Sequence, residues 1–414
     1  MNRLGEILRP HPLRDPRVQV AASQETIGSS LWRLELRDRM DGELEPALRS
    51  LAVRSGGANP FFEPEFQAAA AERFPGGPKR LMILWEQLGE ASSAKLAFPL
   101  HEDRIGLPAV PVLRAFSHAF APLSLPLVDI EDAEESVDRF AALLAKLALP
   151  LPLVFEDFPR DEPAARMLAK ALRLHGFELA QTTGVARAGL TPQPAPSVLP
   201  PSKKSRREFA RQMRKLAERG EVRFETATRF MDVLLRFEEF LLLEMRGWKG
   251  RKGTSIHTIR KTVAFARQAV GAFAEQDRAA IHTLRLDNRP IASLIVLRSG
   301  NRHYPWKTAF DESYRAFSPG GQLMLHASAG LLSDGQFEFA DSLARPGSWM
   351  ERLWPDSIRL TTLAIARTKP QAERVIAAAQ RLDNAKALAR RLLRGGFKAA
   401  LRPRPAPAGE KPDG

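Results

Sequence analysis

A short run rich in proline and glycine, about three quarters of the way along the chain, could bind an anion. It follows a predicted strand over 303–310 and opens a helical pattern that ends at residue 332. Proline suits a first helical turn, and glycine lets a ligand approach the backbone closely. The first amide N–H groups of a helix lack partners inside it and lie at its positive end, where a phosphate can bind. An ordinary strand-to-helix turn is the alternative. The residues of this candidate anion site are Ser318, Pro319, Gly320, Gly321 and Gln322.

The elements around this run alternate between strand and helix. A predicted hairpin leads into it, with a tight turn at Gly300-Asn301, because glycine takes positive φ without a steric penalty. The second half of the chain is predicted to read strand, two helices, three strands, helix and strand, followed by a helix-bearing tail. The predicted ranges are 221–226, 228–246, 256–276, 280–286, 291–297, 303–310, 322–332, 336–342, 358–366 and 370–393.

The first half also alternates, which favours an α/β fold. It is predicted to begin with a strand over 17–22 and a helical region that reaches residue 50. The segment TPQPAPSVLPP contains five prolines and marks a domain boundary. We therefore expect a flexible arm over 1–16, a first half over 17–190, a linker over 191–201, a second half over 202–396 and a disordered tail over 397–414.

Charge is concentrated in two places. The chain has a net charge of +14, with eight Lys and Arg against two Glu over 201–220, and eight against one Asp over 381–404. Such local basicity favours a phosphate, a nucleic acid or an acidic lipid surface as partner, although a solvated basic face is the alternative. Apolar residues Phe209, Met213 and Leu216 form one stripe on the first basic stretch, which is predicted to be a helix capped by Ser202.

Composition excludes several kinds of chemistry. The 414 residues contain no cysteine, so disulfides, thiolate metal sites and a cysteine nucleophile are ruled out. The histidines form no metal-binding pair, and no metal is expected. The sequence has no apolar run of ~18 residues and no apolar N-terminal segment, so we expect neither a membrane span nor a signal peptide, and a cytoplasmic protein.

Several short segments resemble one enzyme family. The order of elements in the second half is that of the GNAT acyltransferase fold, and the whole resembles the CelD-like GNAT acetyltransferases, relatives of the FemAB-type transferases. The resemblance covers roughly residues 17–368 and implies two GNAT-like halves, each a mixed sheet flanked by helices. The segments that carry it are Asn59-Pro60-Phe61-Phe62, Pro126-Leu127-Val128-Asp129, Ser205-Arg206-Arg207, Glu244-Met245-Arg246-Gly247-Trp248-Lys249-Gly250, Trp306-Lys307 with Asp311 and Tyr314, and Phe317-Ser318-Pro319-Gly320.

The donor stays open between two classes. The resemblance implies acetyl-CoA or another acyl-CoA, with its pyrophosphate on the helix N-terminus, while FemAB-type relatives use aminoacyl-tRNA. The usual pyrophosphate loop of GNAT enzymes reads R/Q-x-x-G-x-G/A, whereas residues 315–321 here read R-A-F-S-P-G-G. The basic stretch over 203–219 could suit an RNA.

The resemblance implies direct attack of an amine on a thioester. That reaction needs a base, donors for the developing oxyanion and an acid for the leaving thiolate. Asp311 is the candidate base and Asp341 the second choice, while Tyr314 could protonate the sulfur. Asp311 could instead cap a loop with Ser313, and Tyr314 could pack against the sheet.

A second group of residues is expected to bind the acceptor. Lys307 could hold a negative group of the acceptor or a phosphate of CoA, although a solvated lysine is equally consistent with the sequence. Trp306 and Trp248 could wall the pocket as stacking surfaces, and core positions are the alternative. A structural role is expected for His303. The candidate pocket residues are Trp306, Trp248, Lys249 and Glu244.

The sequence thus predicts a CoA-dependent N-acyltransferase that acts on an amine, such as an amino sugar or a polysaccharide precursor. An aminoacyl-tRNA-dependent transferase is the alternative within the enzymes. The alternative from another class is a catalytically inactive basic protein that binds nucleic acid or a membrane surface.

Overall fold

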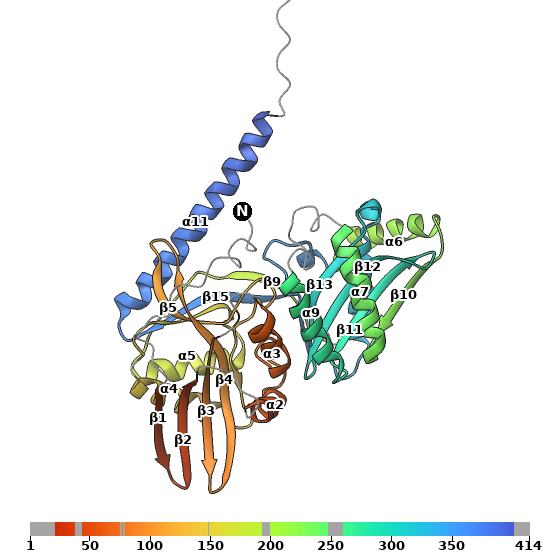
Figure 1. Ribbon diagram of the computed structural model, residues 1–414. Helices are drawn as coiled ribbons and strands as arrows, with labels where there is room; N and C mark the ends of the chain where they lie inside the picture. The colour runs from red at the N-terminus through yellow and green to blue at the C-terminus, as the bar shows by residue number, and fades with distance from the viewer. Residues whose placement is uncertain are drawn as a thin grey trace, which may run out of the picture.

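The computed structural model describes residues 21–400 except 38–43, 75–76, 78, 148, 193–198 and 247–259. Within these ranges a fifteen-stranded mixed sheet runs through the molecule, with helices packed against it (Figure 1). The predicted α/β class, with a mixed sheet flanked by helices, is confirmed, and the sheets expected for the two halves form one continuous sheet. The expected arm over 1–16 lies outside the described residues.

The first part of the sheet begins with antiparallel strands in chain order. The helical region expected up to residue 50 is wrong, because a hairpin occupies its first part and a helix begins only at Glu45. Trp32, Leu34 and Leu36 are buried at every second position, which is the periodicity of a strand with one face on the core. The strands are β1 (Ala21–Ile27), β2 (Ser30–Arg37), β3 (Arg80–Leu88), β4 (Ala91–Ile105) and β5 (Val110–Ala115).

Helices of the first part bury apolar stripes against these strands. Val137, Phe140 and Leu144 lie at helical spacing and are all buried. Three of the helices have proline in the first turn, where a missing N–H costs nothing. These helices are α2 (Glu45–Arg54), α3 (Pro64–Arg73), α4 (Ala133–Leu147) and α5 (Pro163–Leu174), and the remaining strands are β6 (Leu127–Val128), β7 (Leu153–Pro159), β8 (Glu178–Gln181) and β9 (Val185–Leu190).

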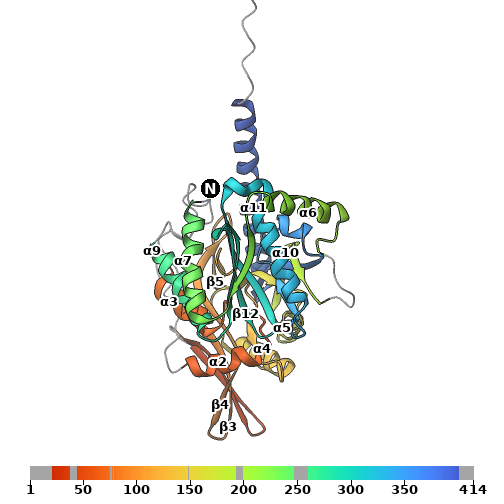
Figure 2. The ribbon, with the colours of Figure 1, turned by 90° about the vertical axis from the view of Figure 1, so that its right-hand side faces the viewer.

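In the described ranges, the second part follows the predicted order of elements. Its helices lie on opposite faces of the central strands, α7 and α9 on one and α10 on the other (Figure 2). Ser202 caps the basic helix by accepting a hydrogen bond from the Ser205 amide, as predicted. The elements are α6 (Lys203–Ala217), β10 (Val222–Ala227), α7 (Phe230–Arg246), α9 (Arg260–Ala274), β11 (Ala279–Leu286), β12 (Arg289–Ser299), β13 (Arg302–Phe310), the 3₁₀ helix η2 (Glu312–Phe317), α10 (Pro319–Leu332), β14 (Phe339–Asp341), the 3₁₀ helix η3 (Trp349–Arg352) and β15 (Asp356–Ala366).

The two parts exchange strands at their junction. The last strand of the chain, β15, lies between β7 on one side and β8 with β9 on the other, all from the first part. In return, β9 pairs with β14 of the second part through Leu190–Ala340 and Gly189–Asp341. Figure 1 shows β9 and β15 in the middle of the molecule, between the two groups of strands. Each part therefore completes its sheet with a strand from the other.

Buried polar contacts also join the two parts. Glu63, fully buried at the start of α3, accepts a hydrogen bond from the Ser299 hydroxyl and lies 2.6 Å from the guanidinium of Arg278. The Tyr304 hydroxyl donates to the carbonyl of Gly57 at 2.8 Å. Gly57 has φ of +74°, and a Cβ there would overlap the Ser299 carbonyl. Only glycine fits so close an approach of two backbones.

The C-terminal helix α11 (Lys369–Ala400) packs on β15 and β8, then projects away from the body (Figure 1). It continues through Gly395 and Gly396, so the predicted helix end at residue 393 is wrong. None of the helices in the described part of the chain combines the length and apolar character needed to cross a bilayer.

Candidate active site

The site begins where the pairing between two neighbouring strands stops. β13 and β14 are parallel and pair only through Arg302–Phe339 and His303–Ala340. Beyond His303, β13 continues to Phe310 with no further pairing to β14. Because β14 ends at Asp341, β13 beyond His303 has no paired neighbour on this side, and we call the interval between this unpaired stretch and the end of β14 the wedge. The chain then passes through η2 to α10, so the helix N-terminus lies at the mouth of this wedge.

The predicted anion site forms the first turn of α10. Ser318 adopts a left-handed conformation, with φ of 50° and ψ of 51°, and Pro319 takes the first helical position. Non-glycine residues seldom adopt this conformation, and it is concentrated at functional sites. The Ser318 side chain makes no capping bond, and its carbonyl accepts from the amide of Gln322 at 3.0 Å. Within the described residues, the amides of Gly320 and Gly321 have no hydrogen-bond acceptor.

Helix α6 lies across this first turn (Figure 2). The Gln322 side chain donates to the carbonyl of Phe209 at 2.8 Å, which fixes α6 to α10. A Cβ on Gly321 would lie 2.7 Å from the Phe209 ring, so this glycine is needed for packing. At Gly320 the nearest atoms to such a Cβ are on Thr308 and Phe310, at 3.6 and 3.7 Å. Those are ordinary contacts, so the protein leaves room for a Cβ at Gly320 but not at Gly321.

Asp311 is held as a helix cap. Its Oδ1 accepts from the Ser313 amide at 3.0 Å and the Ser313 hydroxyl at 2.6 Å, and its Oδ2 lies 2.9 Å from Arg289. Burial alone would raise the pKa of Asp311, but the hydrogen bonds from Ser313 and the charge of Arg289 lower it below the usual range. A carboxylate of lowered pKa is a weak base, so this geometry favours the capping alternative.

Trp306 and Lys307 contact the first part of the chain. The Trp306 indole donates to the Phe120 carbonyl at 2.7 Å, and its ring is 5% exposed within a cluster of aromatic residues. The Lys307 ammonium donates to the Ala119 carbonyl at 3.1 Å and lies 4.1 Å from the centre of the Phe120 ring. The segment around Phe120 therefore covers one side of β13 beside the wedge.

The other predicted site residues lie on several different elements around the wedge. Tyr314 is half-buried in η2 against the apolar core of the second part. Asp341 is buried and forms an ion pair with Arg187, whose guanidinium also donates to the carbonyl of Pro122 at 2.6 Å. Glu244 is buried near the end of α7. Trp248 and Lys249 lie outside the described residues.

The structure adds His118, which the sequence did not single out. Its ring stacks on Phe74 with centroids 4.0 Å apart, and its Nδ1 accepts from the Phe120 amide at 3.1 Å. Burial, together with the charges of Lys307 and Arg114, holds the pKa of His118 well below its usual range. The ring is therefore neutral, with its proton on Nε2. A lone histidine between phenylalanines carries no signal that separates it from a core residue.

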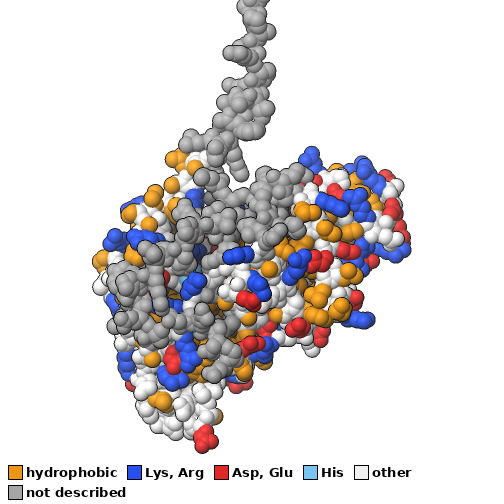
Figure 3. Space-filling view, in the orientation of Figure 1, with side chains coloured by type: hydrophobic (Ala, Val, Ile, Leu, Met, Phe, Trp, Pro, Cys, Tyr) orange, Lys and Arg blue, Asp and Glu red, His pale blue; other side chains and the backbone are white. Residues whose placement is uncertain are grey.

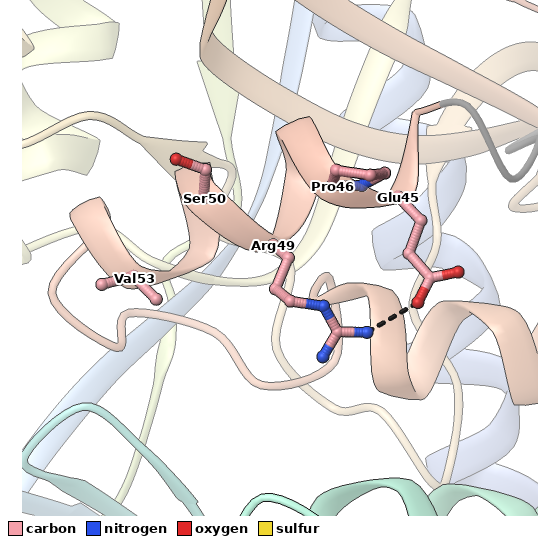
Figure 4. Close-up of a pocket in the computed structure, with 5 residues that line it drawn as sticks. All are labelled: Glu45, Pro46, Arg49, Ser50 and Val53. Carbon is pink, nitrogen blue, oxygen red and sulfur yellow. Dashed lines mark hydrogen bonds and ion pairs between the residues drawn. The ribbon is translucent and has the colours of Figure 1, made fainter.

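Two further features bear on what the site can do. The hollow drawn in Figure 4 lies on α2 alone, where Arg49 lies 2.6 Å from Glu45 and 2.5 Å from Glu65. It lacks the converging polar groups from several elements that a catalytic site needs. Across the residues that the structure describes, no three His, Asp or Glu side chains are grouped as metal ligands.

Comparison with known proteins gives the class of the second part. Residues 203–345 match the family described as Acetyltransferase (GNAT) domain, a range that runs from α6 through α10 and β14. The chain therefore contains a GNAT-type acetyltransferase domain over these residues, and the end of the β13–β14 pairing and the first turn of α10 both lie inside it. A search of curated proteins finds no match.

Solved structures show similarity over most of the chain. FemX has a TM-score of 0.49 and 10% identity, covering 82% of this chain and 99% of its own. The C-terminal domain of a putative lysylphosphatidylglycerol synthetase from Agrobacterium fabrum has a TM-score of 0.44 and 13% identity, with coverages of 69% and 85%. A tandem GNAT protein from the clavulanic acid biosynthesis pathway has 0.35 and 13%, with coverages of 80% and 98%. At such identities and scores, none of them supplies a function for this chain.

Proposed function

We propose that this protein is an acyl-CoA-dependent N-acyltransferase that transfers an acetyl or other acyl group to an amine. The observation that carries the proposal is the pair of unpartnered amides, Gly320 and Gly321, at the mouth of the wedge between β13 and β14. Amides at a helix N-terminus suit a pyrophosphate, and a wedge between parallel strands suits an extended arm. Both features lie within the range that matches the GNAT family.

The direction of β13 separates the candidate residues into two groups. A donor with its phosphates at Gly320 extends its acyl arm back along β13, towards Lys307 and Asp341. Asp311 and Tyr314, both on the loop before α10, stay at the mouth. Their placement supports a role in shaping the phosphate loop, while Asp341 and Lys307 are better placed to meet the thioester.

The acceptor reaches the thioester at the edge of the segment around Phe120, where the first part of the chain meets β13. There the amine nitrogen attacks the thioester carbon, the carbon–sulfur bond breaks, and the proton lost by the amine ends on the thiolate of CoA. Lys307 is the cation beside this position, and Trp306 lies buried next to it. An amino sugar or polysaccharide precursor that carries a negative group would fit this cation.

Calorimetry with acetyl-CoA tests the proposal. We expect Gly320→Asp to abolish binding, because a carboxylate would face the phosphates of the donor. Gly320→Ala is the matched control, because the space around Gly320 accepts a Cβ. It should retain affinity within a factor of about three. Absence of binding to the unmodified protein at millimolar acetyl-CoA would reject the proposal, and equal binding by the Asp and Ala variants would reject the assignment of the phosphate site.

A second candidate is an aminoacyl-tRNA-dependent transferase. It is favoured by the exposed cations of α6, among them Lys203, Arg207 and Arg214, which form no ion pair in the part of the chain that the structure describes. A mobility shift with charged tRNA that persists at moderate salt would support this candidate over the first.

A further inference from the structure

The arginine that follows α6 lies beside the phosphate loop. The guanidinium of Arg219 stacks over the ring of Phe317, 4.7 Å from its centre. Phe317 is buried and is followed directly by Ser318, the left-handed residue at the start of α10. An arginine fixed on an aromatic face keeps its N–H edge free for a planar or tetrahedral anion.

Arg219 is exposed, and no carboxylate of the described residues lies within 4.0 Å of it. Other arginines of this surface are neutralised, as Arg211 is by Glu208 at 2.5 Å and Arg223 by Glu221 at 2.7 Å. The side chain is therefore positioned by Phe317 and has its charge uncompensated next to the mouth of the wedge.

We propose that Arg219 binds the 3′-phosphate of the CoA donor, a step that rests on the function proposed above. CoA carries this third phosphate on its ribose, a short distance from the pyrophosphate that Gly320 and Gly321 would hold. The two amides cannot satisfy it, because they are engaged by the pyrophosphate. The 3′-phosphate therefore needs a cation just outside the helix N-terminus, and Phe317 holds Arg219 at that place. Arginine is suited to phosphate because its N–H groups bind two oxygens together.

The test compares CoA with 3′-dephospho-CoA, which lacks only that phosphate. By calorimetry, the unmodified protein should bind CoA about tenfold more tightly, as expected for one exposed charge-assisted contact. Arg219→Gln should bring the dissociation constant for CoA to that for dephospho-CoA and leave the latter unchanged. Arg211→Gln, on α6 itself and paired with Glu208, should keep the tenfold preference. The preference should shrink as salt is raised from 50 to 500 mM.

Two results would overturn this assignment while leaving the proposed function in place. One is equal affinity of the unmodified protein for the two ligands. The other is an equal loss of affinity for both in Arg219→Gln, which would mean that the arginine only holds Phe317 or contacts the pyrophosphate. Failure of the unmodified protein to bind either ligand would reject the proposed function and this inference together.

Discussion

Glu63 should make the stability of the protein depend on pH in a direction opposite to that of most carboxylates. Burial raises the pKa of Glu63 to about 7 from its usual value of 4.5, although Arg278 and the Ser299 hydroxyl act to lower it. The folded protein therefore binds a proton that the unfolded chain releases above pH 4.5. The stability from this proton is fully present below pH 4.5 and is lost as the pH rises through 7.

The size of the effect follows from that shift. A difference of roughly 2.5 pKa units corresponds to about 3.4 kcal/mol in the free energy of unfolding. About 2.5 kcal/mol of it is lost between pH 5 and pH 8, because the proton is still nearly fully bound in the folded state at pH 5.

Urea unfolding of the protein and of Glu63→Gln at pH 5, 6, 7 and 8 measures this effect. Glutamine keeps the shape of the protonated side chain, so the difference in unfolding free energy between the two proteins should change by about 2.5 kcal/mol over that range. The part of this difference that does not vary with pH contains the cost to Arg278 of losing a carboxylate. Only the change of the difference with pH reports on the proton of Glu63. Glu135→Gln, an exposed change on α4, is the control for the substitution itself. A flat difference for Glu63→Gln would show that the carboxylate is ionised throughout, and the reasoning from burial would fail.

Three further outcomes are expected. Gly57→Ala should lower the free energy of unfolding by about 3 kcal/mol or more in urea, because its Cβ meets backbone, whereas Gly89→Ala, in an open turn, should cost about 1 kcal/mol. Asp341→Asn should cost about 3–5 kcal/mol, since it leaves Arg187 buried without its ion pair; a loss below about 1 kcal/mol would contradict that pairing. The matched domain, residues 203–345, expressed alone should give no cooperative unfolding transition, because it lacks β9 and β15; a sharp transition would show that it folds unaided.

The parts of the fold that local chemistry dictates could be predicted. Pro319 and the two glycines after it mark the start of α10, and Ser202 marks the start of α6. Each signal acts within one helical turn of the residues it controls. The first hairpin differs from the predicted helical region because β1 (AASQETI) has no regular apolar pattern, and the alternation of Trp32, Leu34 and Leu36 with charged residues in β2 is short.

Long-range pairing could not be predicted in the same way. The exchange of β9 and β15 depends on partners far apart in the chain, and the sequence of neither strand indicates which strand it pairs with. The same holds for the candidate site, since Arg187 and Asp341 are separated by 154 positions. Asp311 could be named as a candidate base from the sequence, but its capping bonds and its contact with Arg289 became visible only in the folded chain.

The position of β15 also constrains how the protein is made. During synthesis, β7 emerges from the ribosome about 200 residues before the strand that covers its edge, an interval of ten seconds or more at roughly 5–20 residues per second. Throughout that interval a bare strand edge is open to pairing with other nascent chains. A chain that stalls before Ala366 would keep that edge bare, so we expect truncated products to be held by chaperones or degraded.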